Sequence, residues 1–255
     1  MISKFRILTI LILFAVLASH IFAEDNQDSP TRLFIKAKSF YGLANYDEAI
    51  KTYEQILSRG FESGNLYYNL GNAYFKKGEL GRAILNYQRA RGLIPRDSDL
   101  KANYNFSLLL VKQNFSQVNK NFFKRIIEGY GQRFTLDEMS IIAILLYVFS
   151  IIIIILSFYF DRVKRYLFFI IPVIALPILL NTMALLPEIK RLDNAAIIVA
   201  KEIDSRFEPF DSATPHFRLF EGAEVSILEE KPGWFKIERS DGKVGWVNSS
   251  ALERI

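Results

Sequence analysis

The sequence predicts a multidomain membrane protein that combines an α-helical repeat domain, two transmembrane helices and a C-terminal all-β barrel. Three observations predict this fold class. The chain matches itself at an offset of 34 residues in its first half, two long apolar runs without charge lie in its middle, and short alternating apolar runs fill its last quarter. These are the patterns of paired helices, membrane spans and half-buried strands, respectively.

The two apolar runs, Ser140–Phe160 and Tyr166–Leu186, contain no charged residue. As a helix, each would extend roughly 30 Å, the thickness of the hydrocarbon core of a bilayer. The connecting segment 161–165 (DRVKR) is short and basic, so the helices should be antiparallel with this loop in the cytoplasm. The regions before and after the hairpin are therefore expected together on the opposite side of the membrane.

Residues 1–23 have the order of a secretory signal. Lys4 and Arg6 precede an apolar stretch, and small residues lead to Ala23, after which the sequence becomes acidic and polar. Cleavage is expected after Ala23; if it does not occur, the segment becomes a third membrane anchor. Both outcomes export the region that follows, in agreement with the orientation deduced from the hairpin.

The offset of 34 residues aligns side chains of similar size, namely Ala49 with Ala83, Tyr53 with Tyr87, and Phe40 with Tyr74. This period is typical of tetratricopeptide repeats, in which each unit is an antiparallel helix pair. We expect repeats at 30–63 and 64–97 and a capping helix at 98–113. Gly78 permits the turn of the second repeat, whereas Ala44 replaces the usual glycine in the first, whose turns should be less sharply defined.

Repeats of this family bind peptides or partner proteins along a concave groove lined by the first helix of each pair, and the resemblance implies such a groove here. Amides and lysines on its wall could pair with an extended backbone or an acidic terminus. The alternative for each residue is an ordinary solvent-facing or packing role. The positions that match the groove are Lys38, Tyr41, Asn69, Asn72, Phe75, Lys76, Asn103 and Phe106.

The linker at 114–139 leads into the first apolar run. Between Phe122 and Tyr130, aromatic and aliphatic residues fall on one helical face beside basic residues. This face fits either a helix that lies in the lipid interface or one that packs on the repeat domain. Thr135 and Glu138 have the spacing of a capping box and should begin the first membrane helix. In the second run, the polar Asn181 and Thr182 are expected to hydrogen-bond to the first helix or to a partner's helix.

Residues 193–255 resemble a bacterial SH3 domain, a small β barrel. The matching features are Gly222 before a β run, Gly233-Trp234 opening the next, the tight-turn pair Asp241-Gly242, and Gly245-Trp246-Val247. Some relatives bind cell-wall peptides or protein tails. Trp234 and Phe217 are the candidates for an exposed contact surface, and Trp246 is expected in the core.

The sequence gives no support for an enzyme, a cofactor or a metal site. It contains no cysteine and two histidines, and one of these, His20, lies in the predicted signal, so neither a His-based triad nor a metal cluster can be assembled. No phosphate-binding glycine loop occurs. The net charge of +5 is too small to indicate nucleic-acid binding.

The order of signal, tetratricopeptide repeats, membrane hairpin and SH3-like barrel resembles BatE of the Bacteroides aerotolerance (Bat) operon family. The resemblance implies a bacterial inner-membrane protein with both soluble domains in the periplasm. Its associates would be other Bat proteins, including ones with von Willebrand A domains, linked to a MoxR-type ATPase. The implied role is that of a scaffold in an envelope complex for oxidative or envelope-stress tolerance. The alternative is a peptidoglycan-binding module that recruits a cell-wall enzyme.

Overall fold

The computed structural model describes residues 29–112, 127, 129–131 and 133–255. The predicted signal at 1–23 and most of the predicted interfacial helix lie outside these residues. The chain divides into two compact units, Met1–Phe61 and Glu62–Ile255, and each is described here by itself.

The first unit contains a helix hairpin formed by α2 (Pro30–Gly42) and α3 (Tyr46–Ser58). Ser29 caps α2, since its Oγ accepts a hydrogen bond from the backbone N–H of Arg32. Small and aromatic side chains pack between the helices: Ala37 and Ala49 are fully buried, and the ring of Tyr53 lies 5.8 Å from that of Phe34. This helix pair lies in the range predicted for the first repeat.

Ala44 lies in the turn between α2 and α3 with φ of +56°, a left-handed backbone conformation that favours glycine. The second repeat has Gly78 at the end of α4, in the same left-handed conformation with φ of +85°. The first turn therefore adopts a glycine-type conformation without the glycine.

The second unit begins with the second repeat, which consists of α4 (Gly64–Lys77) and α5 (Leu80–Leu93). A further helix, α6 (Ser98–Leu110), follows it. Gly71 lets α4 approach α5 closely, because a Cβ at this position would lie 2.7 Å from the ring of Tyr87. The Oδ1 of Asp97 accepts a hydrogen bond from the N–H of Leu100 and so caps α6.

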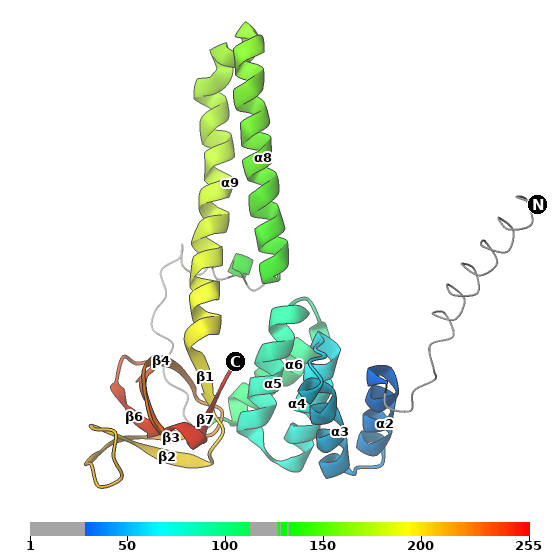
Figure 1. Ribbon diagram of the computed structural model, residues 1–255, viewed down its shortest axis with the longest axis vertical. Helices are drawn as coiled ribbons and strands as arrows, with labels where there is room; N and C mark the ends of the chain where they lie inside the picture. The colour runs from blue at the N-terminus through cyan, green and yellow to red at the C-terminus, as the bar shows by residue number, and fades with distance from the viewer. Residues whose placement is uncertain (1–28, 113–126, 128, 132) are drawn as a thin grey trace, which may run out of the picture. The chain divides into compact units, whose positions relative to one another are not determined.

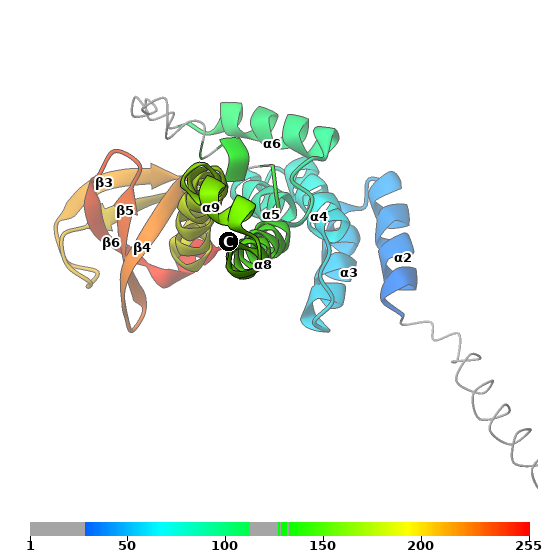
Figure 2. The ribbon, with the colours of Figure 1, turned by 90° about the horizontal axis from the view of Figure 1, so that it is seen from above.

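Two long apolar helices, α8 (Leu136–Tyr159) and α9 (Asp161–Asn194), run side by side in Figures 1 and 2. Both are long and apolar enough to cross a membrane. Thr135 and Glu138 form the predicted capping box at the start of α8. The prediction of a loop at 161–165 is wrong, because only Phe160 separates the helices and DRVKR forms the first turn of α9. This segment lacks glycine and proline, so nothing in it opposes a helix.

Asn181 joins α9 to α8 and to the segment before α8. Its side chain is buried; Nδ2 donates to the carbonyl oxygen of Met139 at 3.1 Å, and Oδ1 accepts from the Tyr130 hydroxyl at 3.0 Å. The predicted hydrogen bond to the first helix is therefore confirmed for Asn181, whereas the Thr182 hydroxyl donates instead to the carbonyl oxygen of Ile178 on its own helix at 2.8 Å. Such bonds contribute about 1 kcal/mol between membrane helices.

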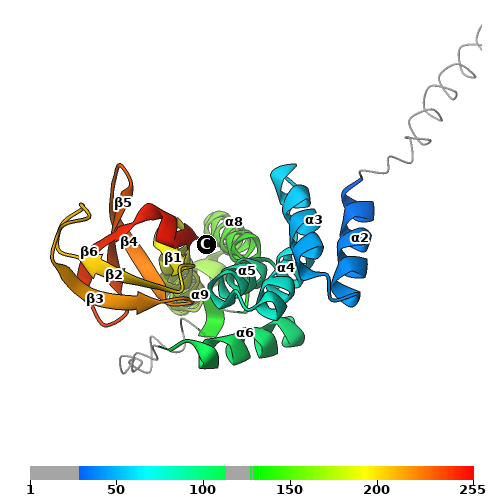
Figure 3. The ribbon, with the colours of Figure 1, turned by 90° about the horizontal axis from the view of Figure 1, so that it is seen from below.

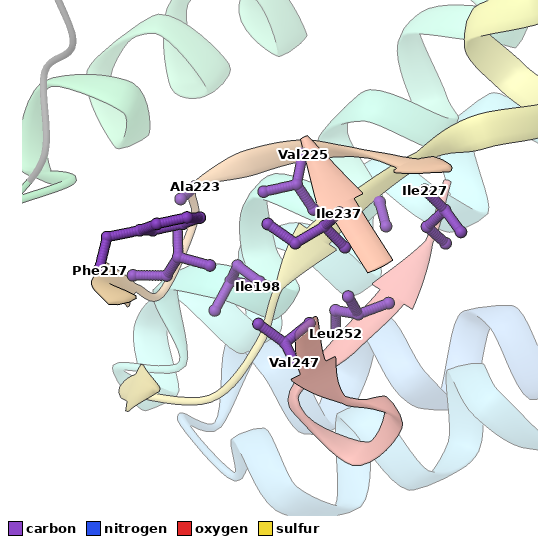
Figure 4. Close-up of a cluster of buried hydrophobic side chains, with 10 residues drawn as sticks. Ile198, Phe217, Ala223, Val225, Ile227, Ile237, Val247 and Leu252 are labelled. Atoms are coloured by element: carbon purple, nitrogen blue, oxygen red, sulfur yellow. The ribbon is translucent and has the colours of Figure 1, made fainter. Parts of the chain in front are cut away.

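A seven-stranded antiparallel sheet follows α9 without a linker, in the order β3-β2-β6-β5-β4-β1-β7. Its strands are β1 (Ala195–Ile198), β2 (Glu202–Arg206), β3 (Pro215–Phe220), β4 (Glu224–Lys231), β5 (Trp234–Arg239), β6 (Val244–Asn248) and β7 (Leu252–Arg254), with a 3-10 turn at Ser249–Ala251 before β7. Alternate side chains from several strands form a single core, shown in Figure 4, where Val225, Ile237 and Val247 lie close together.

We predict that Ala44→Gly stabilises the first repeat by about 0.5–1 kcal/mol. The left-handed conformation costs alanine roughly 1–2 kcal/mol, and the extra freedom of glycine in the unfolded chain offsets only part of this gain. Native-state hydrogen exchange of amides in α2 and α3 would measure the change. Ala37→Gly is the matched control, because Ala37 is buried within α2 and its replacement should speed exchange instead. Unchanged or faster exchange in Ala44→Gly would contradict the prediction.

Candidate protein-binding surfaces

The predicted groove residues of the second unit come from α4 and α6, and two of them form a hydrogen-bonded network. The Oδ1 of Asn72 accepts from the Tyr87 hydroxyl at 2.7 Å and from Asn103 Nδ2 at 3.0 Å. Asn103 Nδ2 also lies 3.0 Å from the hydroxyl oxygen of Tyr68. Asn72 and Asn103 therefore connect α4 to α6. At these two positions the structure favours a packing role over contact with a bound peptide.

Other predicted groove residues remain available to a partner. The rings of Phe75 and Phe106 meet edge to face at 5.9 Å, and Phe106 is 54% exposed. Lys76 is exposed beside them, and half-buried Asn69 donates its side-chain N–H to the carbonyl oxygen of Asn65 on its own helix. This surface, which we call the helical face, combines an apolar aromatic pair with a positive charge.

Lys38 and Tyr41 belong to α2 in the first unit. Lys38 is exposed, whereas Tyr41 is half-buried with its ring 5.5 Å from that of Tyr46 in an edge-to-face contact. Tyr41 thus contributes to the packing of the first hairpin.

The two predicted contact residues of the barrel differ in burial. Trp234 is half-buried at the start of β5, opposite Asn248 of β6. Phe217 is 9% exposed and belongs to the core cluster, so the prediction that it contributes to an exposed surface is wrong. Along β3 the inward positions are Phe217 and Leu219, and the alternation of a strand places both on the core side.

Trp246 is buried as expected, but on the outer side of the sheet. Its neighbour Val247 points into the core cluster, and successive residues of a strand face opposite sides. The ammonium groups of Lys231 and Lys236 lie 4.8 and 5.8 Å from its ring centroid, and Trp246 is only 6% exposed. Cation–π contacts and the lysine stems therefore take the place of a hydrophobic covering.

A buried arginine ties the β5–β6 turn to the barrel. Arg239 Nε and Nη2 donate to the two carboxylate oxygens of Asp241 at 2.9 and 2.7 Å, and its guanidinium lies 4.5 Å from the ring centroid of Phe217. The hydrogen bonds from Arg239, together with one from the backbone N–H of Lys243, lower the pKa of Asp241 to about 2. Charge-assisted, two-pronged pairs of this kind are among the stronger polar contacts in proteins.

The sequence reasoning missed a pair of exposed aromatic residues in the loop between β2 and β3. Phe207 is 57% exposed and Phe210 is 46% exposed, and the ring of Phe207 lies 4.1 Å from that of His216. Two phenylalanines three residues apart in an acidic, proline-containing stretch were the available signal, FEPFD.

Helix α5 contacts the barrel directly, and in Figure 3 it lies between the barrel and α4. The contact depends on two glycines. A Cβ at Gly81 would lie 2.5 Å from the carbonyl oxygen of Ile198 in β1, and a Cβ at Gly222 would lie 2.6 Å from the side chain of Ile84. A side chain at Gly81 would overlap backbone and move the two elements apart, whereas at Gly222 the overlap is with side-chain ends and the left-handed backbone, with φ of +83°, adds a separate preference for glycine.

Polar side chains of α5 complete this contact. Gln88 donates to Glu224 at 2.9 Å, Arg89 donates to the carbonyl oxygen of Arg254 in β7 at 2.6 Å, and Arg82 forms an ion pair with Glu253 at 3.4 Å. We call this set of contacts between α5 and the barrel the α5–barrel interface. It joins the second repeat to the C-terminal domain.

Comparison with known families agrees with this architecture. A tetratricopeptide repeat model matches residues 64–97, and a bacterial SH3 domain model matches residues 206–253. No curated protein matches the chain. The chain thus combines a helical tetratricopeptide-repeat region, two candidate membrane helices and a bacterial SH3-like domain. The repeat and the SH3 domain indicate binding to proteins or to peptidoglycan.

We predict that Gly81→Ala separates α5 from the barrel, because its methyl group would overlap a backbone oxygen. Arg82→Cys and Glu253→Cys, introduced into the otherwise cysteine-free chain, would report the contact through a short bifunctional maleimide. Gly81→Ala should reduce the intramolecular crosslink several-fold.

Gly92→Ala is the control for this experiment, because Gly92 lies on the same helix and a Cβ there meets no atom within 4 Å. Both substitutions raise helix propensity, so they differ only in the overlap with the barrel. Equal crosslinking in the two variants would show that the close approach at Gly81 does not hold the interface.

We predict that the barrel loses stability as the pH falls from about 4 to about 2. The pKa of Asp241 is lower in the folded state than its ordinary value of 3.8, so the ion pair with Arg239 contributes fully above pH 4 and is lost through the folded pKa of about 2. Both tryptophans of the chain, Trp234 and Trp246, lie in the barrel, so tryptophan fluorescence during denaturant unfolding reports on this domain in the intact protein.

Asp241→Asn should lower the free energy of unfolding at pH 7 by about 1–2 kcal/mol, since the pair is partly solvent-screened. It should also flatten the decline between pH 4 and 2. Asp211→Asn removes an exposed carboxylate from another turn of the barrel and should leave the profile unchanged. A profile for Asp241→Asn parallel to that of the wild type would contradict the assignment.

Proposed function

We propose that the protein is a membrane-anchored scaffold of a bacterial envelope complex, with its repeat and SH3-like domains binding partner proteins in the periplasm. The helices α8 and α9 cross the inner membrane, and the segment 161–165 lies in the cytoplasm. The role is not catalytic: binding surfaces on the two domains bring other proteins together at the membrane.

The α5–barrel interface is the observation that carries this proposal. The second repeat precedes the helix hairpin in the sequence and the barrel follows it, yet Gly81, Gln88 and Arg89 of α5 contact the barrel. Two domains in direct contact must share one side of any membrane that the hairpin crosses. The basic segment 161–165 favours the cytoplasm for the turn, which supports a periplasmic location for both domains.

Cysteine accessibility tests this topology, because each introduced cysteine would be the only thiol in the chain. Ser58→Cys and Ser240→Cys place thiols at exposed positions of the repeat region and the barrel, and Arg165→Cys places one near the hairpin turn. In intact spheroplasts a membrane-impermeant maleimide should label the first two, and the third only after lysis. Labelling of Arg165→Cys in intact spheroplasts, or protection of either domain, would contradict the topology.

The resemblance to BatE supports a more specific setting for the scaffold. We propose other Bat-family membrane and periplasmic proteins as its partners and oxidative or envelope-stress tolerance as its physiological context. Crosslinking in native membranes followed by identification of the captured proteins would test this. Recovery of von Willebrand A-domain proteins together with this chain would support the Bat complex, and their consistent absence from the captured set would oppose it.

Peptidoglycan is a second candidate ligand, favoured by the bacterial SH3 domain and the half-buried Trp234 at the start of β5. The purified full chain in detergent should then sediment with insoluble peptidoglycan, and Trp234→Ala should abolish retention. Leu228→Ala, which removes an exposed apolar side chain from β4, is the matched control. Retention that survives Trp234→Ala would argue against this tryptophan as a cell-wall contact.

A further inference from the structure

The loop between β2 and β3 presents apolar surface that the barrel does not use. Phe207 and Phe210 are both largely exposed, although the core of the same domain buries aromatic and aliphatic side chains. Covering the exposed part of an apolar side chain is favourable because it removes that surface from water. Two such residues three positions apart therefore form a patch of the kind that marks interaction sites.

Hydrogen bonds within the loop connect its two ends and its turn. Arg206 Nη1 donates to the carbonyl oxygen of Ala213 at 2.6 Å, and the backbone N–H groups of Phe207 and Phe210 donate to the carbonyl oxygens of Thr214 and Glu208. The ring of His216 in β3 contacts the Phe207 ring in a tilted arrangement. This contact restricts the Phe207 ring, so a ligand would lose less entropy in fixing it.

The charge of the loop is uniformly negative. Residues 207–214 contain Glu208 and Asp211, both exposed, and no lysine or arginine. The flanking Arg206 is engaged with the loop backbone. Carboxylates attract cations, and so do the faces of aromatic rings, so both kinds of side chain favour the same type of ligand. The same charge opposes anionic lipid surfaces.

We propose that this loop, with Phe207, Glu208, Phe210, Asp211 and His216, binds a lysine- or arginine-bearing segment of a partner protein. The phenylalanine rings contact the aliphatic stems and cationic groups, and the two carboxylates pair with the charges. The inference rests on the proposed scaffold function and names the partner chemistry that one of its surfaces selects. This surface does not involve Trp234, which lies on β5 and pairs across to β6.

Fluorescence anisotropy with the full chain in detergent tests the proposal, using a labelled peptide of alternating lysine and alanine and a matched peptide of glutamate and alanine. The lysine peptide should bind and the glutamate peptide should not. The double variant Phe207→Ser/Phe210→Ser should weaken binding about tenfold. Glu208→Gln/Asp211→Asn should weaken it similarly and reduce its dependence on salt concentration.

Two controls isolate the loop. Glu229→Gln/Glu230→Gln removes two adjacent exposed carboxylates from β4, and Leu228→Ser removes an exposed apolar side chain from the same strand. Both should leave affinity unchanged. Tryptophan fluorescence during unfolding checks that each loop variant keeps the barrel folded. All substituted loop side chains are exposed, so we expect wild-type unfolding curves.

Wild-type affinity in the loop variants, equal affinity for both peptides, or no binding of the lysine peptide by the wild type would each overturn the proposal. Loss of peptidoglycan retention in Phe207→Ser/Phe210→Ser without loss of peptide binding would also overturn it and assign the loop to the cell wall. The scaffold function is judged separately: partners crosslinked in native membranes that persist in the loop variants would leave it standing while this inference fails.

Discussion

The close approach of α5 to the barrel at Gly81 is the constraint on which the architecture of the second unit depends. The chain leaves α5, forms α6 and the two apolar helices, and returns through β1, whose last residue, Ile198, meets α5 again. Because β1 begins at Ala195, directly after the end of α9 at Asn194, the C-terminal end of α9 is joined to the barrel without a linker. A repeat, a hairpin and a barrel that could have been independent modules are thereby closed into one unit.

The same interface includes β7, a strand at the edge of the sheet. β7 is a terminal strand in the sheet order, and an open terminal strand offers its backbone groups to other chains. Arg89 of α5 occupies the carbonyl oxygen of Arg254, and Arg82 pairs with Glu253 in the adjacent position of β7. Two side chains of α5 therefore reach the short final strand, and the Arg89 guanidinium satisfies one backbone carbonyl there.

Local patterns in the sequence predicted most of the elements but not their contacts. The period of 34, the capping box at Thr135 and Glu138, and the apolar runs are short-range features, and each predicted the element that it encodes. The alternation along β3 places Phe217 on the same face as Leu219, a local pattern that the exposed-contact hypothesis for Phe217 did not take into account. By contrast, Gln88 of α5 and its partner Glu224 are 136 residues apart in the chain, so no local signal joins them. The turn between α8 and α9 likewise depends on the extended backbone of Phe160, and no glycine or proline in this segment indicates it.

The two exposed surfaces of the second unit carry opposite charge, and this bears on how one chain could hold several proteins. The helical face places Lys76 beside the Phe75–Phe106 pair, and α4 ends in two lysines. The β2–β3 loop sets its phenylalanines among carboxylates. Under the proposed scaffold function, apolar side chains supply affinity at both surfaces, and we expect the charges to select against the same ligand binding at each, since a like-charged approach is unfavourable. A scaffold with two such surfaces would engage two different partners without competition between them, which a single larger patch of mixed charge could not do.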